Sequence, residues 1–161
     1  INAAYIRALP AEKFAQLAAP WLDKVVQSKV DRTLLCANLQ PRCEFLADIP
    51  PRVAFIDTLP DYELELFENK KQKTTPDTAR EALTAILAVL EPLQAWNKDA
   101  IFEACRAKAE AMEKKNGWLM YPLGIALAGQ RSTPGGGTDL AAMLGKEKTL
   151  QRIRLALEKL G

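Results

Sequence analysis

The sequence predicts an all-α protein made of two packed helical subdomains, and three observations support this fold class. Apolar residues recur every three or four positions through much of the second half, which is the spacing of one face of an α-helix. Prolines divide the first half into short segments, because proline removes a hydrogen-bond donor and clashes inside a helix. Strand signals are weak, and the best candidate, residues 53–56, is too short to outweigh its surroundings.

The clearest predicted helix spans residues 76–90. Thr75 suits the N-cap position, and Pro76 suits the first helical position, where a missing N–H costs little. Its apolar residues then fall on one face: Ala79, Leu83, Ile86, Leu87 and Leu90.

Two further helices are predicted nearer the C-terminus. One opens at Asn97 and is stopped by the Asn-Gly pair at residues 116–117, because these residue types commonly end helices. The other covers residues 146–160, with an inward face of leucine and isoleucine. Gly145 separates it from a short amphipathic stretch over residues 140–144.

A polar, basic connector over residues 68–75 (ENKKQKTT) separates two helical groups. We therefore expect a first subdomain over residues 1–70 and a second over residues 71–161. The first is the more broken of the two, with prolines at positions 10, 20, 41, 50, 51 and 60.

Composition is that of an ordinary globular protein. The 161 residues are 48% hydrophobic and 26% charged, and no apolar run approaches the length of a membrane span. The N-terminal segment lacks the pattern of a secretory signal. The net charge of +2 is nearly balanced, so binding to nucleic acid would have to rely on local clusters of lysine and arginine.

The residue types present exclude much catalytic and metal chemistry. Without histidine, Ser-His-Asp and Cys-His nucleophiles and most catalytic metal sites are impossible. Cys36, Cys43 and Cys105 follow no CxxC pattern, so we expect reduced, mostly buried thiols in a cytoplasmic protein. Neither glycine-rich phosphate motif is present. We assign no catalytic residue and no metal ligand.

Three separated stretches carry a family resemblance. They are NAAYIRALPAEKFAQLAAPWL at residues 2–22, LQPRCEFLADIPPRVAFI at residues 39–56, and YPLGIALAGQRSTPGGGTDLAAMLGKEKTLQRIRLAL at residues 121–157. The last is the most specific, because its Thr-Pro-Gly and Leu-Gly-Lys-Glu elements have the family's order and spacing. The chain resembles the C-terminal anticodon-binding region of bacterial-type glutamyl-tRNA synthetases.

The resemblance implies an α-helical cage that grips the anticodon arm of tRNA. It also implies that ATP, magnesium and the glutamylation reaction belong to a catalytic domain covalently linked upstream, with the exit from that domain inside the first subdomain. The chain by itself is then expected to be catalytically inactive and to hold no cofactor. Its expected partner is glutamate tRNA, and also glutamine tRNA if base selection is relaxed.

The resemblance places part of the binding site in the loop before residue 140. Thr133 and Pro134 match the Thr-Pro element whose loop touches anticodon bases, and Gly136 belongs to the glycine run that follows. The alternative is that Thr133 is an N-cap with Pro134 at the first helical position. Residues 135–137 could meet an anion through free N–H groups, or form only a flexible turn. Arg131 is expected to contact a phosphate or stack on a splayed base.

Two more candidate positions concern base selectivity. Gln40 and Arg42 lie in the LQPR turn, where the family reads the last anticodon base, and the resemblance associates glutamine at the position of Gln40 with tolerance of glutamine tRNA. An amide offers both a donor and an acceptor, whereas a guanidinium offers only donors. Gly124 departs from the family, which commonly has an arginine there for the first anticodon base.

Lysines provide the remaining candidates. Lys70, Lys71 and Lys115 are expected to contact phosphates, although a lysine run is more often a solvated surface. Trp118 could stack on a base, because it directly precedes the most specific block. An alternative function from another class is a helical protein-interaction module without RNA binding.

Overall fold

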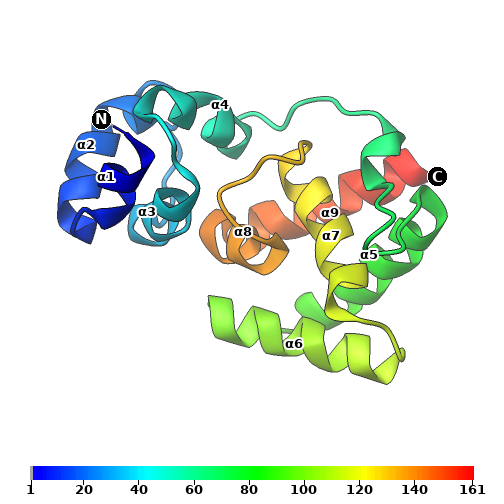
Figure 1. The fold of residues 1–161 in the computed structure, drawn as a ribbon. Helices are drawn as coiled ribbons and strands as arrows, with labels where there is room; N and C mark the ends of the chain where they lie inside the picture. Colours follow the sequence, from blue (N-terminus) through cyan, green and yellow to red (C-terminus); the bar gives the residue numbers. More distant parts are fainter. Residues whose placement is uncertain (1) are drawn as a thin grey trace.

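The computed structural model describes residues 2–161, and this part of the chain is helical (Figure 1). The N-terminal group comprises α1 (Ala3–Ala8), α2 (Ala11–Asp23), α3 (Arg32–Leu39) and α4 (Ile49–Val53). The C-terminal group comprises α5 (Pro76–Leu90), α6 (Lys98–Ala111), α7 (Asn116–Ala128), α8 (Gly137–Leu144) and α9 (Lys146–Leu160). Within residues 2–161, strand-like pairing is limited to one isolated bridge, between Asn69 and Thr74. The predicted all-α class is confirmed.

Short 3-10 turns link the smaller helices. They are η1 (Gln40–Arg42), η2 (Leu46–Asp48), η3 (Ala54–Ile56) and η4 (Leu64–Phe67). The strand candidate at residues 53–56 is therefore helical: it comprises the end of α4 and all of η3. In the N-terminal group α2 packs against α3 and α4, while α1 packs against η1.

Helix α7 is the centre of the C-terminal group. It packs against α5, α6, α8 and α9, and it is buried on nearly all sides along its second half. Helix α5 begins and ends as predicted, and the Thr75 hydroxyl accepts a hydrogen bond from the Thr78 N–H at its N-terminus. Helix α9 also matches its predicted range, and Asn97 caps α6 through the Ala100 N–H.

The predicted end of the second long helix was wrong. Helix α6 stops at Ala111, because Glu113 adopts a left-handed backbone with φ of 57°. The Lys114 N–H then bonds the Ala109 carbonyl at 2.8 Å, which closes the helix in a Schellman motif. Asn116, expected to stop this helix, instead begins α7.

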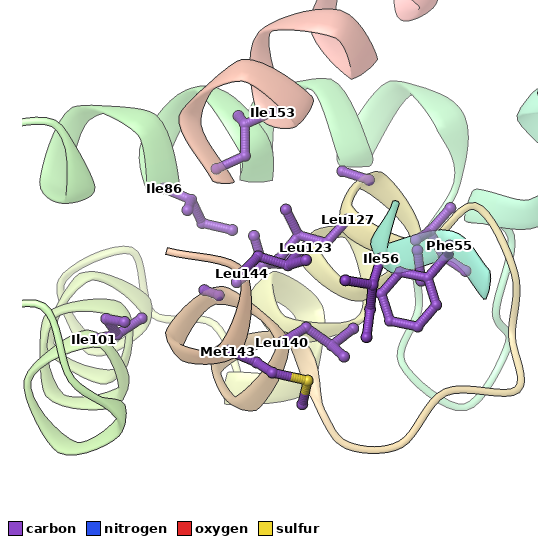
Figure 2. Close-up of a cluster of buried hydrophobic side chains, with 14 of the residues drawn as sticks. Phe55, Ile56, Ile86, Ile101, Leu123, Leu127, Leu140, Met143, Leu144 and Ile153 are labelled. Atoms are coloured by element: carbon purple, nitrogen blue, oxygen red, sulfur yellow. The ribbon is translucent and has the colours of Figure 1, made fainter. Parts of the chain in front are cut away.

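A polar junction joins the two groups of helices. Arg152 of α9 is only 5% exposed, and its guanidinium donates to the Leu127 carbonyl at 2.7 Å and the Ile56 carbonyl at 2.9 Å. Lys148 also donates to the Ile56 carbonyl, at 3.1 Å. Figure 2 shows the side chains of Phe55 and Ile56 beside Leu127. Residues of η3 thus anchor the N-terminal group on the C-terminal bundle.

The cysteines are free and buried, as expected, with Cys36 and Cys43 in the N-terminal group and Cys105 on α6. Burial raises the pKa of Cys105 to about 12. In residues 2–161 no helix combines the length and apolar character needed to cross a membrane. η4 packs against α5 and α7, and the division of the chain after residue 70 stays a prediction.

Candidate nucleic-acid interface

A pocket of about 210 Å³ lies between α7 and the loop that precedes α8. Four predicted site residues line it: Gly124, Arg131, Thr133 and Gly136. Gln72, from the turn before α5, forms part of the wall. The fold thus brings together residues that the sequence placed in one functional block.

Glycines allow the loop to lie directly on α7. A Cβ added to Gly137 would meet the Met120 carbonyl oxygen at 2.7 Å, so α8 begins in backbone contact with α7. A Cβ added to Gly124 would meet nothing nearer than 3.9 Å, the distance to the Gly137 nitrogen. Close packing therefore requires glycine at 137, whereas position 124 has room for a Cβ in ordinary contact with the backbone of Gly137.

The Thr133–Pro134 segment is a folded loop. The Thr133 hydroxyl donates to the Gly135 carbonyl at 2.7 Å, and Pro134 is buried. The N-cap interpretation of Thr133 was wrong, because α8 begins at Gly137 with Gly136 as its cap residue. Thr133 therefore holds the loop closed, and its hydroxyl oxygen keeps acceptor capacity on the pocket side.

An internal carboxylate occupies the start of α8. Asp139 Oδ2 accepts the Gly136 N–H at 3.1 Å, and its Oδ1 pairs with the Lys98 ammonium at 3.1 Å. The Gly136 N–H is thus already bonded to an anionic group. Gly136 contributes backbone shape to the pocket wall, and Asp139 takes the place that an external anion would occupy there.

The Arg131 side chain is tied to backbone carbonyls. Its Nε donates to the Tyr121 hydroxyl at 3.0 Å, and Nη2 lies 3.3 Å from the carbonyls of Glu65 and Glu68. Tyr121 in turn donates to the Leu66 carbonyl at 2.7 Å. These bonds fix the guanidinium as an exposed, oriented plane at the edge of the pocket.

Gln40 lies away from this pocket and holds α1. Its amide nitrogen donates to the carbonyls of Ile6 at 2.8 Å and Leu9 at 2.9 Å. The Ile6 carbonyl also accepts the N–H of the C-cap residue Leu9 at 3.3 Å, so Gln40 adds a second donor to Ile6 and bonds the Leu9 carbonyl just after α1. The side chain is half-buried, and its amide oxygen remains available as an acceptor.

Arg42 is connected to the pocket loop through Asn38. Its exposed guanidinium donates to the Asn38 carbonyl at 2.8 Å. Asn38 also lies against the loop, since a Cβ on Gly135 would be 3.4 Å from its Cγ. The predicted residues of the LQPR turn and of the glycine loop therefore belong to neighbouring parts of the molecule.

The lysines border a second pocket, of about 390 Å³. Lys71 and Lys115 line it, whereas Lys70, also exposed, does not. Gln72 lines both pockets, so the two adjoin. Trp118 is only 5% exposed and Lys114 lies 4.8 Å above its ring, so it is covered rather than open to a base.

Three residues that line the first pocket were not among the predicted site residues. Tyr121, Gln72 and Gln130 all line it. Gln130 donates to the Ser132 carbonyl at 2.7 Å and also approaches the carbonyls of α4. Tyr121 and Gln130 belong to the same sequence block as the loop, but nothing in the sequence pairs Gln72 with it.

The profile of a family described as the anticodon binding domain matches residues 13–157. The chain belongs to the anticodon-binding domain family. This match covers nearly the whole fold, including both pockets and the junction between the groups of helices.

Relatives of this anticodon-binding domain are glutamate–tRNA ligases. The chain is 37% identical over 160 residues to that of Clostridium tetani and 36% identical over 162 residues to one from Clostridium botulinum. Each alignment covers 99% of this chain and 33% of the relative, so the chain spans about a third of their length.

Solved structures agree. A glutamate tRNA ligase from Elizabethkingia meningosepticum, in complex with its amino acid, superposes with a TM-score of 0.79 at 25% identity, covering 99% of this chain and 31% of that one. A glutamate-tRNA synthetase from Elizabethkingia anophelis, at 24% identity and a TM-score of 0.74 over 98% of this chain and 30% of its own, shares the fold. The predicted resemblance is confirmed.

Proposed function

We propose that this chain binds the anticodon arm of glutamate tRNA and positions it for glutamylation by a linked catalytic domain in the cytoplasm. The observation that carries the proposal is the first pocket, where Gly124, Arg131, Thr133 and Gly136 converge within a chain of the anticodon-binding family. A base turned out of its stack can be bonded by backbone groups and hydroxyls and can stack on an arginine plane. The pocket offers the acceptor capacity of the Thr133 hydroxyl and the exposed guanidinium plane of Arg131.

ATP and magnesium are assigned to the catalytic domain. Within residues 2–161, no three side chains among aspartate, glutamate and cysteine gather as metal ligands would. In this proposal the described residues contribute RNA binding, and we assign no catalytic step to them.

Base selection at two positions is proposed to be relaxed. Within residues 2–161 the bonds of Gln40, in the LQPR turn, use its amide nitrogen and leave its amide oxygen as an acceptor. Position 124 lacks the arginine common in the family. A missing bidentate side chain would forfeit about 1–3 kcal/mol of discrimination at the first anticodon base. Glutamine tRNA, which differs at the last anticodon base, is therefore the second proposed partner.

The test is binding of the chain to anticodon stem-loops from glutamate and glutamine tRNA, with single-base variants of each. We expect salt-dependent binding, because phosphate contacts release counterions. We also expect similar affinity for the two stem-loops. Gly124→Arg should strengthen discrimination at the first anticodon base by roughly tenfold, with Gly124→Ala as the control, since both replacements have room for their Cβ.

Absence of stem-loop binding would refute the proposed function and favour a protein-interaction role. A strong preference for the glutamate stem-loop would leave anticodon binding in place and refute relaxed selection. If Gly124→Arg and Gly124→Ala behave alike on every base variant, position 124 does not face the first anticodon base.

A further inference from the structure

Four lysines from two distant segments surround the second pocket. Lys71 and Lys73 come from the turn before α5, and Lys114 and Lys115 come from the corner between α6 and α7. All four are exposed, and none is among the ion pairs formed within residues 2–161. Glu113 is the single acidic residue among those that line the pocket. The cavity thus carries a surplus of positive charge that the protein does not neutralise.

Both segments are held rigidly. In the turn, backbone hydrogen bonds join Asn69 and Thr74 in both directions, at 3.1 and 3.0 Å, and the buried Thr74 hydroxyl donates to the Phe67 carbonyl at 2.8 Å. The α6–α7 corner is closed by the Schellman motif at Glu113. A ligand would therefore meet preformed backbones, which reduces the ordering entropy lost on binding.

The backbone at this pocket is strained. Lys73 and Glu113, with φ of 59° and 57°, are the non-glycine residues that have positive φ within residues 2–161, and both line this pocket. Elsewhere the fold places glycine at such positions, as at Gly129 and Gly145. Strain of this kind concentrates at functional sites. At both positions the chain has a residue with a side chain, although glycine would relieve the backbone strain.

The N-terminus of α7 adds to the positive potential. Lys115 is its cap residue, no side chain caps the helix, and its first turn contains no acidic residue. Lys114 lies over the Trp118 ring, which orients its ammonium at the pocket. Lysine ammonium groups are point charges that suit phosphate oxygens without reading sequence.

We propose that this lysine pocket grips backbone phosphates of the same RNA whose anticodon bases enter the first pocket. The proposal rests on the proposed function and adds a separate, sequence-independent subsite to it. The lysine pocket adjoins the first pocket at Gln72, which lines both. RNA phosphates at the lysines would therefore lie next to bases at the glycine loop. A free polyphosphate shares the same chemistry.

The experiment measures stem-loop affinity for the chain between ~50 and ~200 mM salt. Lys71→Gln/Lys115→Gln should weaken binding about tenfold at low salt and reduce the slope of log affinity against log salt by about 1.5. The loss should be equal for cognate and base-substituted stem-loops, because phosphates carry no sequence information. These two lysines have ordinary backbones, so the variant leaves the strained residues unchanged.

One control keeps the charge at the pocket, and the other makes the same charge change elsewhere. Lys71→Arg/Lys115→Arg should bind as the parent chain does, and Lys13→Gln/Lys29→Gln, exposed lysines of the N-terminal group, should leave affinity and salt slope unchanged. Thermal unfolding monitored by circular dichroism should give the same midpoint for every variant. Inorganic triphosphate is the probe for free polyphosphate.

The outcomes separate this subsite from the proposed function. If the parent chain selects its stem-loop and the lysine variant binds like the control variant, the phosphate subsite is refuted while anticodon binding stands. If triphosphate binding depends on the lysines and RNA binding does not, the ligand is a free polyphosphate and our assignment is wrong. If no stem-loop binds, both proposals fail together.

Discussion

The N-terminal and C-terminal groups of helices reach ordered structures by different means. In the N-terminal group α1, α3 and α4 have eight residues or fewer and α2 has 13. Side chains there bond to backbone carbonyls at helix ends, as Gln40 does after α1 and Arg42 at α3. In the C-terminal group α8 has eight residues, the other helices have 13 to 15, and they pack around the apolar α7. Side-chain caps occur in both groups, at α1 and α3 as at α5 and α6. Apolar burial supports both groups, and they differ in how their helices are connected: α7 contacts every other helix of the C-terminal group, whereas α1 packs on η1 and is bonded by Gln40.

This difference separates local from global effects of substitution. A lost polar contact in α1–α4 should loosen one helix, because its neighbours have bonds of their own. A change at α7 should affect the entire C-terminal bundle, since four helices pack on it. The junction at Arg152 is the point at which the two groups stabilise each other.

The largest effect is expected for Arg152→Met, which removes the donor to the Leu127 and Ile56 carbonyls. The Leu127 carbonyl would lose its bond from Arg152, and the Ile56 carbonyl would keep only its bond from Lys148. We expect a cost of about 2–4 kcal/mol in the free energy of unfolding. Urea unfolding followed by hydrogen exchange should show the two groups unfolding separately. Arg154→Met is the control: its exposed side chain makes one 3.6 Å ion pair, and the change should stay within about 0.5 kcal/mol. Equal losses in both variants would contradict the role of the junction.

Next in size is Gly137→Ala, which tests the contact between α7 and α8. The new Cβ would meet the Met120 carbonyl at 2.7 Å, and relieving the overlap should destabilise the bundle by about 1–3 kcal/mol. Gly124→Ala, on the opposite side of the contact, should have the reverse sign and stabilise by about 0.5–1 kcal/mol, because alanine favours a helix interior. Thermal unfolding measures both. Two shifts of the same sign would show that the helices separate freely.

Gln40→Leu should have a smaller and strictly local effect. Loss of both bonds to α1 should cost about 1–2 kcal/mol. Amide exchange should rise in α1 and remain unchanged in α5–α9. Gln16→Leu, at an exposed position of α2, is the matched control. Faster exchange throughout the C-terminal bundle would contradict the independence of the two groups.

The smallest predicted effect is the pH dependence contributed by Asp57. Partial burial acts to raise its pKa, but hydrogen bonds from Ser28 and Gln27, together with Lys148, bring the pKa below its ordinary value. The folded pKa is therefore lower than that of the unfolded chain, about 3.9. Its contribution is complete above that pH and is lost as pH falls through the folded pKa. Asp57→Asn should cost about 1 kcal/mol at neutral pH, and this difference should vanish in acid. A constant difference at every pH would show that the charge contributes nothing.

Local signals made much of the fold predictable. Thr75, Pro76 and Asn97 mark helix starts through chemistry confined to a few residues, and the structure begins α5 and α6 there. The α6–α7 corner was predicted wrongly because a left-handed glutamate ends the helix where glycine or asparagine is usual. The strain at Glu113 has no signature in the sequence.

The candidate site was predictable where it is continuous in sequence. Residues 124–136 fold into one pocket wall, so a motif found them together. The wall completed by Gln72 and the contact of Gln40 with α1 join segments far apart in the chain. Such pairings depend on tertiary packing, which periodicity and turn chemistry do not encode.

The three buried thiols offer a way to time the opening of each group of helices. Cys36 and Cys43 report on the N-terminal group and Cys105 on the C-terminal bundle. Burial raises the pKa of all three, and that of Cys105 reaches about 12, so the folded protein presents almost no thiolate to an alkylating reagent. Labelling must wait for local unfolding, and the rate at each cysteine then measures how often its surroundings open. The chain thus contains native reporters of local unfolding, two in the N-terminal group and one in the C-terminal bundle, without any engineered probe.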